Sequence, residues 1–171
     1  MRSAGGGALA GAVVAVQING QATKASSQTV AQMAQRTRQF EPHVLVVQTG
    51  TAVSFPNFDT VRHHVYSFSA TKTFDIKLYA GTPAEPVVFD TPGVAALGCN
   101  IHDRMSAHIV VVDTPIFAKS DDAGTATFDL PAGDHVLMFW HAKLGATTLQ
   151  SMPLHVGNGA GRTELTLVGA D

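Results

Sequence analysis

Short runs of alternating apolar and polar residues fill the middle of this 171-residue chain. Successive side chains of a β-strand point to opposite faces, so such alternation indicates strands with one buried face. The pattern predicts strands over residues 40–47, 51–55, 65–69, 74–79, 87–89, 94–97 and 107–112. Turn-forming residues separate these runs, as in an antiparallel β-sandwich. We therefore expect an all-β fold.

The segments before residue 40 are harder to interpret. Residues 8–16 are apolar and predict a strand that enters a hairpin at Asn19-Gly20, although Arg2 ahead of them would also suit a weak signal-peptide core. We favour the strand and expect a leader to precede the given sequence. Residues 29–38 predict a short helical turn or an ordered loop. No apolar run approaches 18 residues, so we expect no transmembrane helix.

Composition narrows the classes of function. With 45% hydrophobic and 14% charged residues, the chain can bury a sizeable core. Its formal net charge is -2, and it has no basic run with interleaved aromatic residues, so nucleic acid is not an expected partner. The single cysteine excludes an intrachain disulfide.

The candidate chemistry lies between two of the predicted strands. Cys99, His102 and Met105 follow one another at C-x2-H-x2-M spacing, which brings a thiolate, an imidazole and a thioether into one loop. Electron-transfer copper sites combine one Cys, two His and a weak axial Met. His63 or His64 would supply the second imidazole. The alternative is that Cys99 and Met105 are ordinary core residues.

Two further motifs accompany this loop. Val53, Phe55, Asn57 and His63 form a V-x-F-x-N-x5-H element, and a P-G-x5-C approach leads into Cys99. Together with the loop, these motifs resemble the plastocyanin-like cupredoxins, and the short ligand loop is most similar to that of amicyanin. The resemblance implies a Greek-key β-sandwich over residues 38–117. It also implies one copper ion, held by His63, Cys99, His102 and Met105.

The sequence leaves the choice between His63 and His64 open, because adjacent strand residues face opposite ways. Alternation favours His64, which shares its face with Tyr66 and Phe68, whereas the family register favours His63; we prefer His63.

Many cupredoxins have Pro where this chain has Ile101 and Asn where it has His64. We expect Asn57 to tie the two ligand loops together, His102 to be the more exposed ligand, and Asp103 to be a solvated turn residue.

The C-terminal part resembles another β-module. Residues 121–140 contain a D-x-x-G turn and an L-P-x-G turn, an order similar to that in carboxypeptidase regulatory-like, transthyretin-like modules, where a strand follows each turn. We therefore expect residues 1–37 and 118–171 to form a second small β-sandwich. The alternative is one enlarged cupredoxin with terminal extensions.

The cupredoxin resemblance implies a soluble, periplasmic or otherwise extracytoplasmic one-electron carrier, with a cytochrome or a dehydrogenase as partner. A methylamine-utilisation setting follows only by analogy. The alternative is a copper-binding storage, delivery or interaction module. We do not expect an enzyme, because a closed four-ligand site leaves no open position for a substrate.

Of the other histidines, His108 is expected near the site without binding metal, and the rest are expected to be surface or satisfied core residues: His43, His135, His141 and His155.

Overall fold

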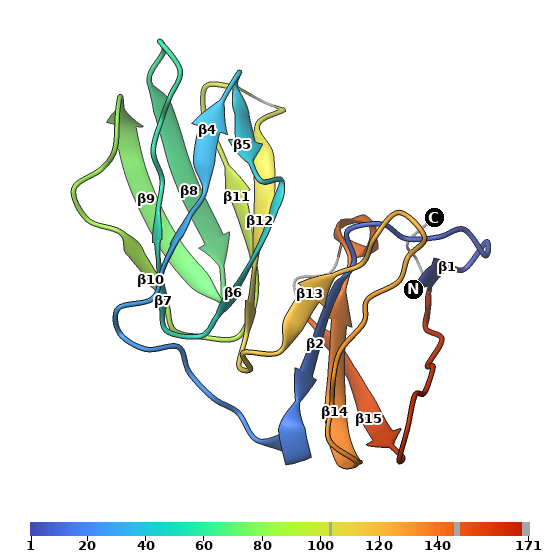
Figure 1. The fold of residues 1–171 in the computed structure, drawn as a ribbon. Coiled ribbons are helices and arrows are strands. Elements are labelled where there is room, and N and C mark those ends of the chain that lie inside the picture. Colours follow the sequence, from blue (N-terminus) through green and yellow to red (C-terminus); the bar gives the residue numbers. More distant parts are fainter. Residues whose placement is uncertain (103, 146–147, 169–171) are drawn as a thin grey trace. The chain divides into compact units, whose positions relative to one another are not determined.

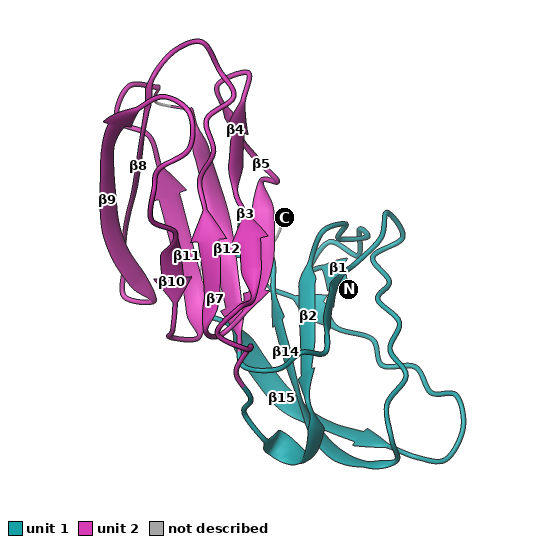
Figure 2. Ribbon diagram, turned by 60° about the vertical axis from the view of Figure 1, so that its left-hand side comes forward, with its two compact units in different colours: residues 1–23, 113–171 teal, residues 24–112 magenta. Residues whose placement is uncertain are grey.

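The computed structural model describes residues 1–102, 104–145 and 148–168 and consists almost entirely of β-strands. The chain forms two compact units, residues 24–112 and residues 1–23 with 113–171 (Figure 2). These boundaries differ from the predicted 38–117. Residues 24–37 belong to the 24–112 unit, because a strand within them pairs with another strand of that unit. Residues 113–117 belong to the other unit, called the terminal unit below.

One layer of the 24–112 unit is a five-stranded sheet in the order β6-β12-β11-β8-β9 (Figure 1). Its strands are β6 (Val44–Gln48), β12 (Ser106–Val112), β11 (Gly93–Gly98), β8 (His63–Ser69) and β9 (Lys72–Tyr79). All neighbours are antiparallel except β12 and β6, which are parallel. The prediction of an all-β fold is confirmed.

The second layer is a three-stranded sheet, β10-β7-β3, accompanied by a two-stranded hairpin of β4 and β5. Its strands are β10 (Val87–Phe89), β7 (Thr51–Ser54), β3 (Val30–Gln32), β4 (Ala34–Arg36) and β5 (Gln39–Glu41). A helical turn within residues 29–38 was therefore the wrong expectation. Pairing with β7 and β5, together with burial of residues 33–35, overrides the weak local preference of this polar segment.

A continuous core lies between these layers. Both sheets contribute to it, and its fully buried members include Met33, Val53, Val65, Phe89 and Ile109. Burying each such side chain contributes about 1.5–3 kcal/mol relative to leaving it exposed. The same cluster includes Cys99 and Met105, so the loop between β11 and β12 packs on this core.

Tyr79, at the end of β9, anchors the segment that leads into His63. Its hydroxyl donates a hydrogen bond to the carbonyl of Phe55 at 2.6 Å and accepts one from the side-chain amide of Gln35. Burial raises the pKa of Tyr79 to about 12. The hydroxyl therefore stays protonated at neutral pH. Its hydrogen bond to the carbonyl of Phe55 fixes the start of the segment 55–62, which leads to His63.

The terminal unit contains a four-stranded antiparallel sheet in the order β13-β2-β14-β15. Its strands are β13 (Phe117–Lys119), β2 (Val13–Gln17), β14 (Gly133–Trp140) and β15 (Gln150–Val156). Strands β1 (Arg2–Ser3) and β16 (Thr166–Leu167) form a separate parallel pair. Leu9, Val16, Leu137 and Leu167 are among the buried residues of its own core.

Two local expectations in this unit need correction. The predicted hairpin at Asn19-Gly20 does not form: a 3-10 turn, η1 (Ile18–Gly20), follows β2, whose partners are β13 and β14. The D-x-x-G turn is present, since the Asp121 carboxylate accepts hydrogen bonds from the backbone amides of Ala123 and Thr125. Residues 125–130, however, form no strand. A second short 3-10 turn, η2 (Ala142–Leu144), follows β14.

None of the helices in the described part of the chain is long and apolar enough to cross a membrane.

Candidate metal centre

Three segments meet at one end of the 24–112 unit: the β4–β5 turn, the segment entering β8, and the loop between β11 and β12 (Figure 1). Gly98, the last residue of β11, pairs with Ser106, the first of β12. This pairing closes residues 99–105 into a short loop. The backbone amide of Met105 donates to the carbonyl of His102 at 2.9 Å, which tightens it further. Strand pairing therefore fixes the C-x2-H-x2-M motif at both ends.

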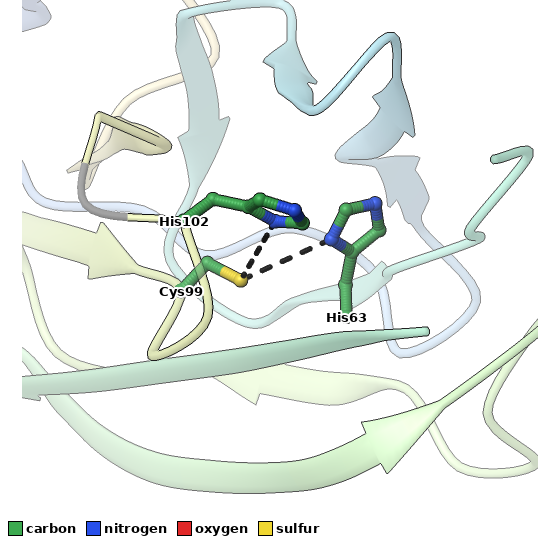
Figure 3. A group of neighbouring side chains, drawn as sticks. All are labelled: His63, Cys99 and His102. Atoms are coloured by element: carbon green, nitrogen blue, oxygen red, sulfur yellow. Dashed lines mark hydrogen bonds between the residues drawn. The ribbon is translucent and has the colours of Figure 1, made fainter. Parts of the chain in front are cut away.

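His63, Cys99 and His102 form a group whose ligand atoms all lie within 4.8 Å of one another (Figure 3). Sγ of Cys99 lies 3.9 Å from Nδ1 of His63 and 3.9 Å from Nδ1 of His102. His63 is fully buried and Cys99 is 6% exposed, whereas His102 is half-buried. Two imidazoles thus turn the same ring nitrogen toward one sulfur.

These distances suit a bound metal ion. Bond lengths of about 2.3 Å to sulfur and about 2.05 Å to nitrogen place the two donors about 3.8 Å apart when the angle at the metal is about 120°, and about 3.6 Å apart at a tetrahedral angle. The observed 3.9 Å is closer to the first value. Both sulfur–nitrogen pairs therefore have a spacing at which one metal ion can bind both donors.

The structure separates His63 from its neighbour. His64 is not part of the three-residue group, and its Nε2 pairs instead with the carboxylate of Asp75. Hydrogen bonds from Lys77 and from His64 lower the pKa of that carboxyl. On β8 the buried face carries Val65 with His63, while Phe68 is 75% exposed on the opposite face.

Met105 lies beside Cys99. It is 2% exposed, belongs to the same core cluster as Cys99, and lines with it a hollow of about 340 Å³. Tyr66 lines the same hollow. A Cβ at Gly98 would lie 2.6 Å from the Tyr66 ring, so glycine at this position lets the ring lie against the backbone next to Cys99.

The carboxylate of Asp59 contacts the ring nitrogen of His63 that does not face Cys99. Oδ2 of Asp59 lies 2.8 Å from Nε2 of His63, and the Asp59 side chain is 14% exposed. The backbone amides of Thr37 and Arg38 donate to the same carboxylate at 2.6 and 2.9 Å. Burial raises the pKa of Asp59, but the hydrogen bonds from Arg38, His63 and Thr37 outweigh it and leave the pKa below its usual value. Asp59 is therefore ionised at neutral pH.

The amides that hold Asp59 come from an unusual turn. Thr37 and Arg38 link β4 to β5 with φ values of 50° and 58°, the left-handed region that normally favours glycine or asparagine. For other residues this conformation costs about 1–2 kcal/mol each. The two hydrogen bonds to Asp59 offset part of that cost.

Asn57 shapes the segment that carries Asp59. Its side-chain amide donates to the carbonyls of Val61 and Tyr79, at 2.8 and 3.1 Å, and its side-chain oxygen accepts from the backbone amide of Asp59 at 2.9 Å. The expected tie between the two ligand loops is therefore replaced by a tie within one loop and to the end of β9.

Sequence reasoning missed the carboxylate and its support. Asp59 stands four residues before His63, but no motif distinguishes it from a solvated loop residue. The turn at Thr37 and Arg38 lies across the predicted start of the ligand-bearing domain at residue 38, with Thr37 outside it. Only the D-x3-H spacing could have pointed to this pair.

The remaining histidines lie outside this group. The rings of His43 and His108 meet edge to face with centroids 5.9 Å apart. His135 and His141 are buried and hydrogen-bonded to backbone groups, and exposed His155 pairs with Asp134. Asp103, expected to be a solvated turn residue, lies outside the described residues.

No protein-family model matches this chain, and no curated protein does. Several solved structures are similar in part. A copper-containing nitrite reductase from Thermus scotoductus SA-01 is 21% identical over 55% of this chain and 26% of its own, with a TM-score of 0.46. A reduced mutant of amicyanin is 14% identical over 57% of this chain and 97% of its own, with a TM-score of 0.44.

A purple cupredoxin from Nitrosopumilus maritimus is 20% identical over 49% of this chain and 99% of its own, with a TM-score of 0.41. The chain thus spans about a quarter of the nitrite reductase but nearly all of the two cupredoxins. All three TM-scores are under 0.5. The chemistry of the site is therefore inferred from its own side chains.

Proposed function

We propose that residues 24–112 form a type 1 copper site and that the protein carries single electrons between redox partners. The observation that carries this proposal is the position of the Cys99 sulfur, 3.9 Å from the Nδ1 atoms of both His63 and His102. One Cys and two His in a trigonal arrangement, with a weak Met, are typical of electron-transfer copper sites. Met105 is the proposed fourth ligand.

The donor set explains the choice of metal and reaction. Thiolate and thioether suit Cu(I), while imidazole suits copper in both oxidation states. A bound copper ion would supply the exchange of one electron between Cu(I) and Cu(II). The paired strands at both ends of the loop and the Asp59 contact hold the ligands in place, which limits their movement when the charge of the site changes.

Burial of the ligands indicates where electrons would pass. His63 and Cys99 face the core and exclude water, whereas His102 is half-buried and stands next to Ile101, which is 46% exposed. We propose that a redox protein such as a cytochrome or a dehydrogenase docks over His102. We also propose an extracytoplasmic, periplasmic location, and no enzymatic activity, because four ligands would leave no open position for a substrate.

Visible absorption of the copper-loaded protein tests the proposal. An intense thiolate-to-Cu(II) band that bleaches on reduction and returns on oxidation is the expected result. A colourless protein that binds only Cu(I) would instead favour copper storage or delivery, and absence of copper binding would reject both functions. The same sample can be assayed for reversible one-electron titration.

Met105→Leu is expected to keep the copper and the colour while raising the reduction potential. Loss of a weak axial ligand favours the lower coordination number that Cu(I) prefers. We expect the preference for Cu(I) over Cu(II) to rise about tenfold, which is about 59 mV for a one-electron couple. Potentiometric titration measures this change.

Met33→Leu is the matched control, because Met33 is fully buried in the same core cluster but lies outside the ligand loop. Its reduction potential should equal that of the native protein, because no proposed ligand is removed. The exchange should lower the free energy of unfolding by less than about 1.5 kcal/mol. Equal shifts in both variants would show a general packing effect, and loss of copper from Met105→Leu would show a different role for Met105.

A further inference from the structure

We propose that Asp59 is a positioning residue for the metal centre: its carboxylate fixes the ring of His63 with Nδ1 toward Cys99, and its negative charge favours Cu(II) over Cu(I). The inference rests on the proposed copper function. It assigns a role to a residue that stands at an unspecified position of the V-x-F-x-N-x5-H motif and contacts the ring nitrogen of His63 that does not face Cys99.

The hydrogen bond decides which nitrogen of His63 can bind a metal. Both oxygens of the Asp59 carboxylate already accept backbone N–H groups, from Thr37 and Arg38. The carboxylate therefore acts as an acceptor, and Nε2 of His63, 2.8 Å from Oδ2, acts as the donor. In a neutral imidazole the other nitrogen then has the free lone pair. That nitrogen, Nδ1, is the one that faces the Cys99 sulfur at 3.9 Å. The contact thus selects the tautomer that suits the site.

The carboxylate is itself held in place from two sides. The carboxylate oxygens of Asp59 accept hydrogen bonds from the backbone amides of Thr37 and Arg38, in the β4–β5 turn. The backbone amide of Asp59 donates a hydrogen bond to the side-chain oxygen of Asn57. Because the turn residues adopt left-handed φ values, the hairpin presents both amides to one carboxylate. A segment more than 20 residues away in sequence therefore orients a metal ligand it does not touch.

The charge of Asp59 has a predictable effect on the two oxidation states. A carboxylate that accepts a hydrogen bond from the N–H group of a histidine ligand makes that ligand more basic. The additional basicity and the nearby negative charge stabilise the more highly charged Cu(II) more than Cu(I). Asp59 should consequently lower the reduction potential of the site.

The chain offers a matched control on the next residue. Nε2 of His64 pairs with Asp75 just as Nε2 of His63 pairs with Asp59, but His64 is outside the ligand group. The Asp75 side chain is 36% exposed and is shared with Lys77. Asp75→Asn therefore removes the same charge from the partner of a histidine that is not part of the group around Cys99.

The experiment compares the copper-loaded full chain with Asp59→Asn and Asp75→Asn. We expect Asp59→Asn to bind Cu(II) about 10–100-fold more weakly, with a much smaller loss for Cu(I), so that the preference for Cu(I) rises about tenfold, or about 59 mV. Asp75→Asn should shift the potential by a small fraction of this. Competition titrations with each oxidation state and potentiometry provide the readouts.

Equal shifts in the two variants would overturn the proposal, because they would reflect only the loss of one negative charge. An unchanged potential in Asp59→Asn, combined with a lower unfolding midpoint, would also overturn it and leave Asp59 a purely structural role. Absence of the visible band from the native protein would reject the copper function itself, independently of any Asp59 effect.

A measurement on the unaltered, metal-free protein covers the case in which Asp59→Asn does not fold. Long-range proton–nitrogen NMR correlations should show His63 protonated at Nε2, with a slowly exchanging proton, and unprotonated at Nδ1. A His63 ring protonated at Nδ1 alone would contradict the proposal without any copper being present.

Discussion

Replacing Cys99 with serine is expected to abolish the visible band of the copper-loaded protein completely while the fold is retained. Cys99 is the only cysteine of the chain, so no other residue can supply a thiolate. Serine is similar in size but offers a hard oxygen, which suits copper poorly. Visible absorption after titration with Cu(II) measures the loss.

The same substitution has a predictable cost in stability. Cys99 is 6% exposed within the core cluster, and burying a hydroxyl there lowers the free energy of unfolding by about 1–3 kcal/mol unless it finds a partner. Far-ultraviolet circular dichroism and denaturant unfolding of the metal-free protein serve as controls. Persistence of the band in a folded Cys99→Ser variant would show that Cys99 is not the ligand.

His63→Ala and His64→Ala are expected to differ sharply, although the residues are adjacent. His63→Ala removes a fully buried ring whose Nδ1 faces Cys99, so copper affinity should fall more than about 100-fold, beyond the range caused by losing only a ligand's hydrogen-bond partner. The visible band should disappear or change character. Added imidazole can enter the vacated space and should restore the band.

His64→Ala should shift the band only slightly, because this ring pairs with Asp75, which still has Lys77 as a partner. The two variants are each other's controls and are compared by visible absorption with and without imidazole. The opposite result, with the band lost in His64→Ala and kept in His63→Ala, would assign the ligand to His64.

Local features of the fold could largely be predicted from the sequence. Alternating apolar residues placed most strands of the 24–112 unit close to their observed bounds, because strand periodicity depends on neighbouring residues alone. The exception is 40–47, predicted as one strand but observed as β5 and β6. The polar segment before residue 40 could not be placed in the same way. Its strand β3 forms through pairing with β7, 22 residues further along the chain, and such pairing leaves little trace in local composition.

The choice between His63 and His64 shows where pattern reasoning reached its limit. Alternation correctly put the two histidines on opposite faces, but the large apolar side chains of Tyr66 and Phe68 suggested the wrong buried face. Phe68 is 75% exposed, while Val65 and Ser67 are buried with His63. Which face of a strand is covered depends on the layer that packs against it, and side-chain size alone does not reveal that layer.

The sequence by itself determined that three donor groups lie together: the thiol of Cys99, the imidazole of His102 and the thioether of Met105 stand within a seven-residue loop, a spacing that remains local in any fold. The family resemblance already favoured His63 over His64, but only the tertiary structure shows His63 beside Cys99 and shows which carboxylate contacts it. Asp59 receives hydrogen bonds from Thr37 and Arg38, 22 and 21 residues earlier in the chain. These contacts arise from the packing of a hairpin against a loop, so their geometry appears only once the chain has folded.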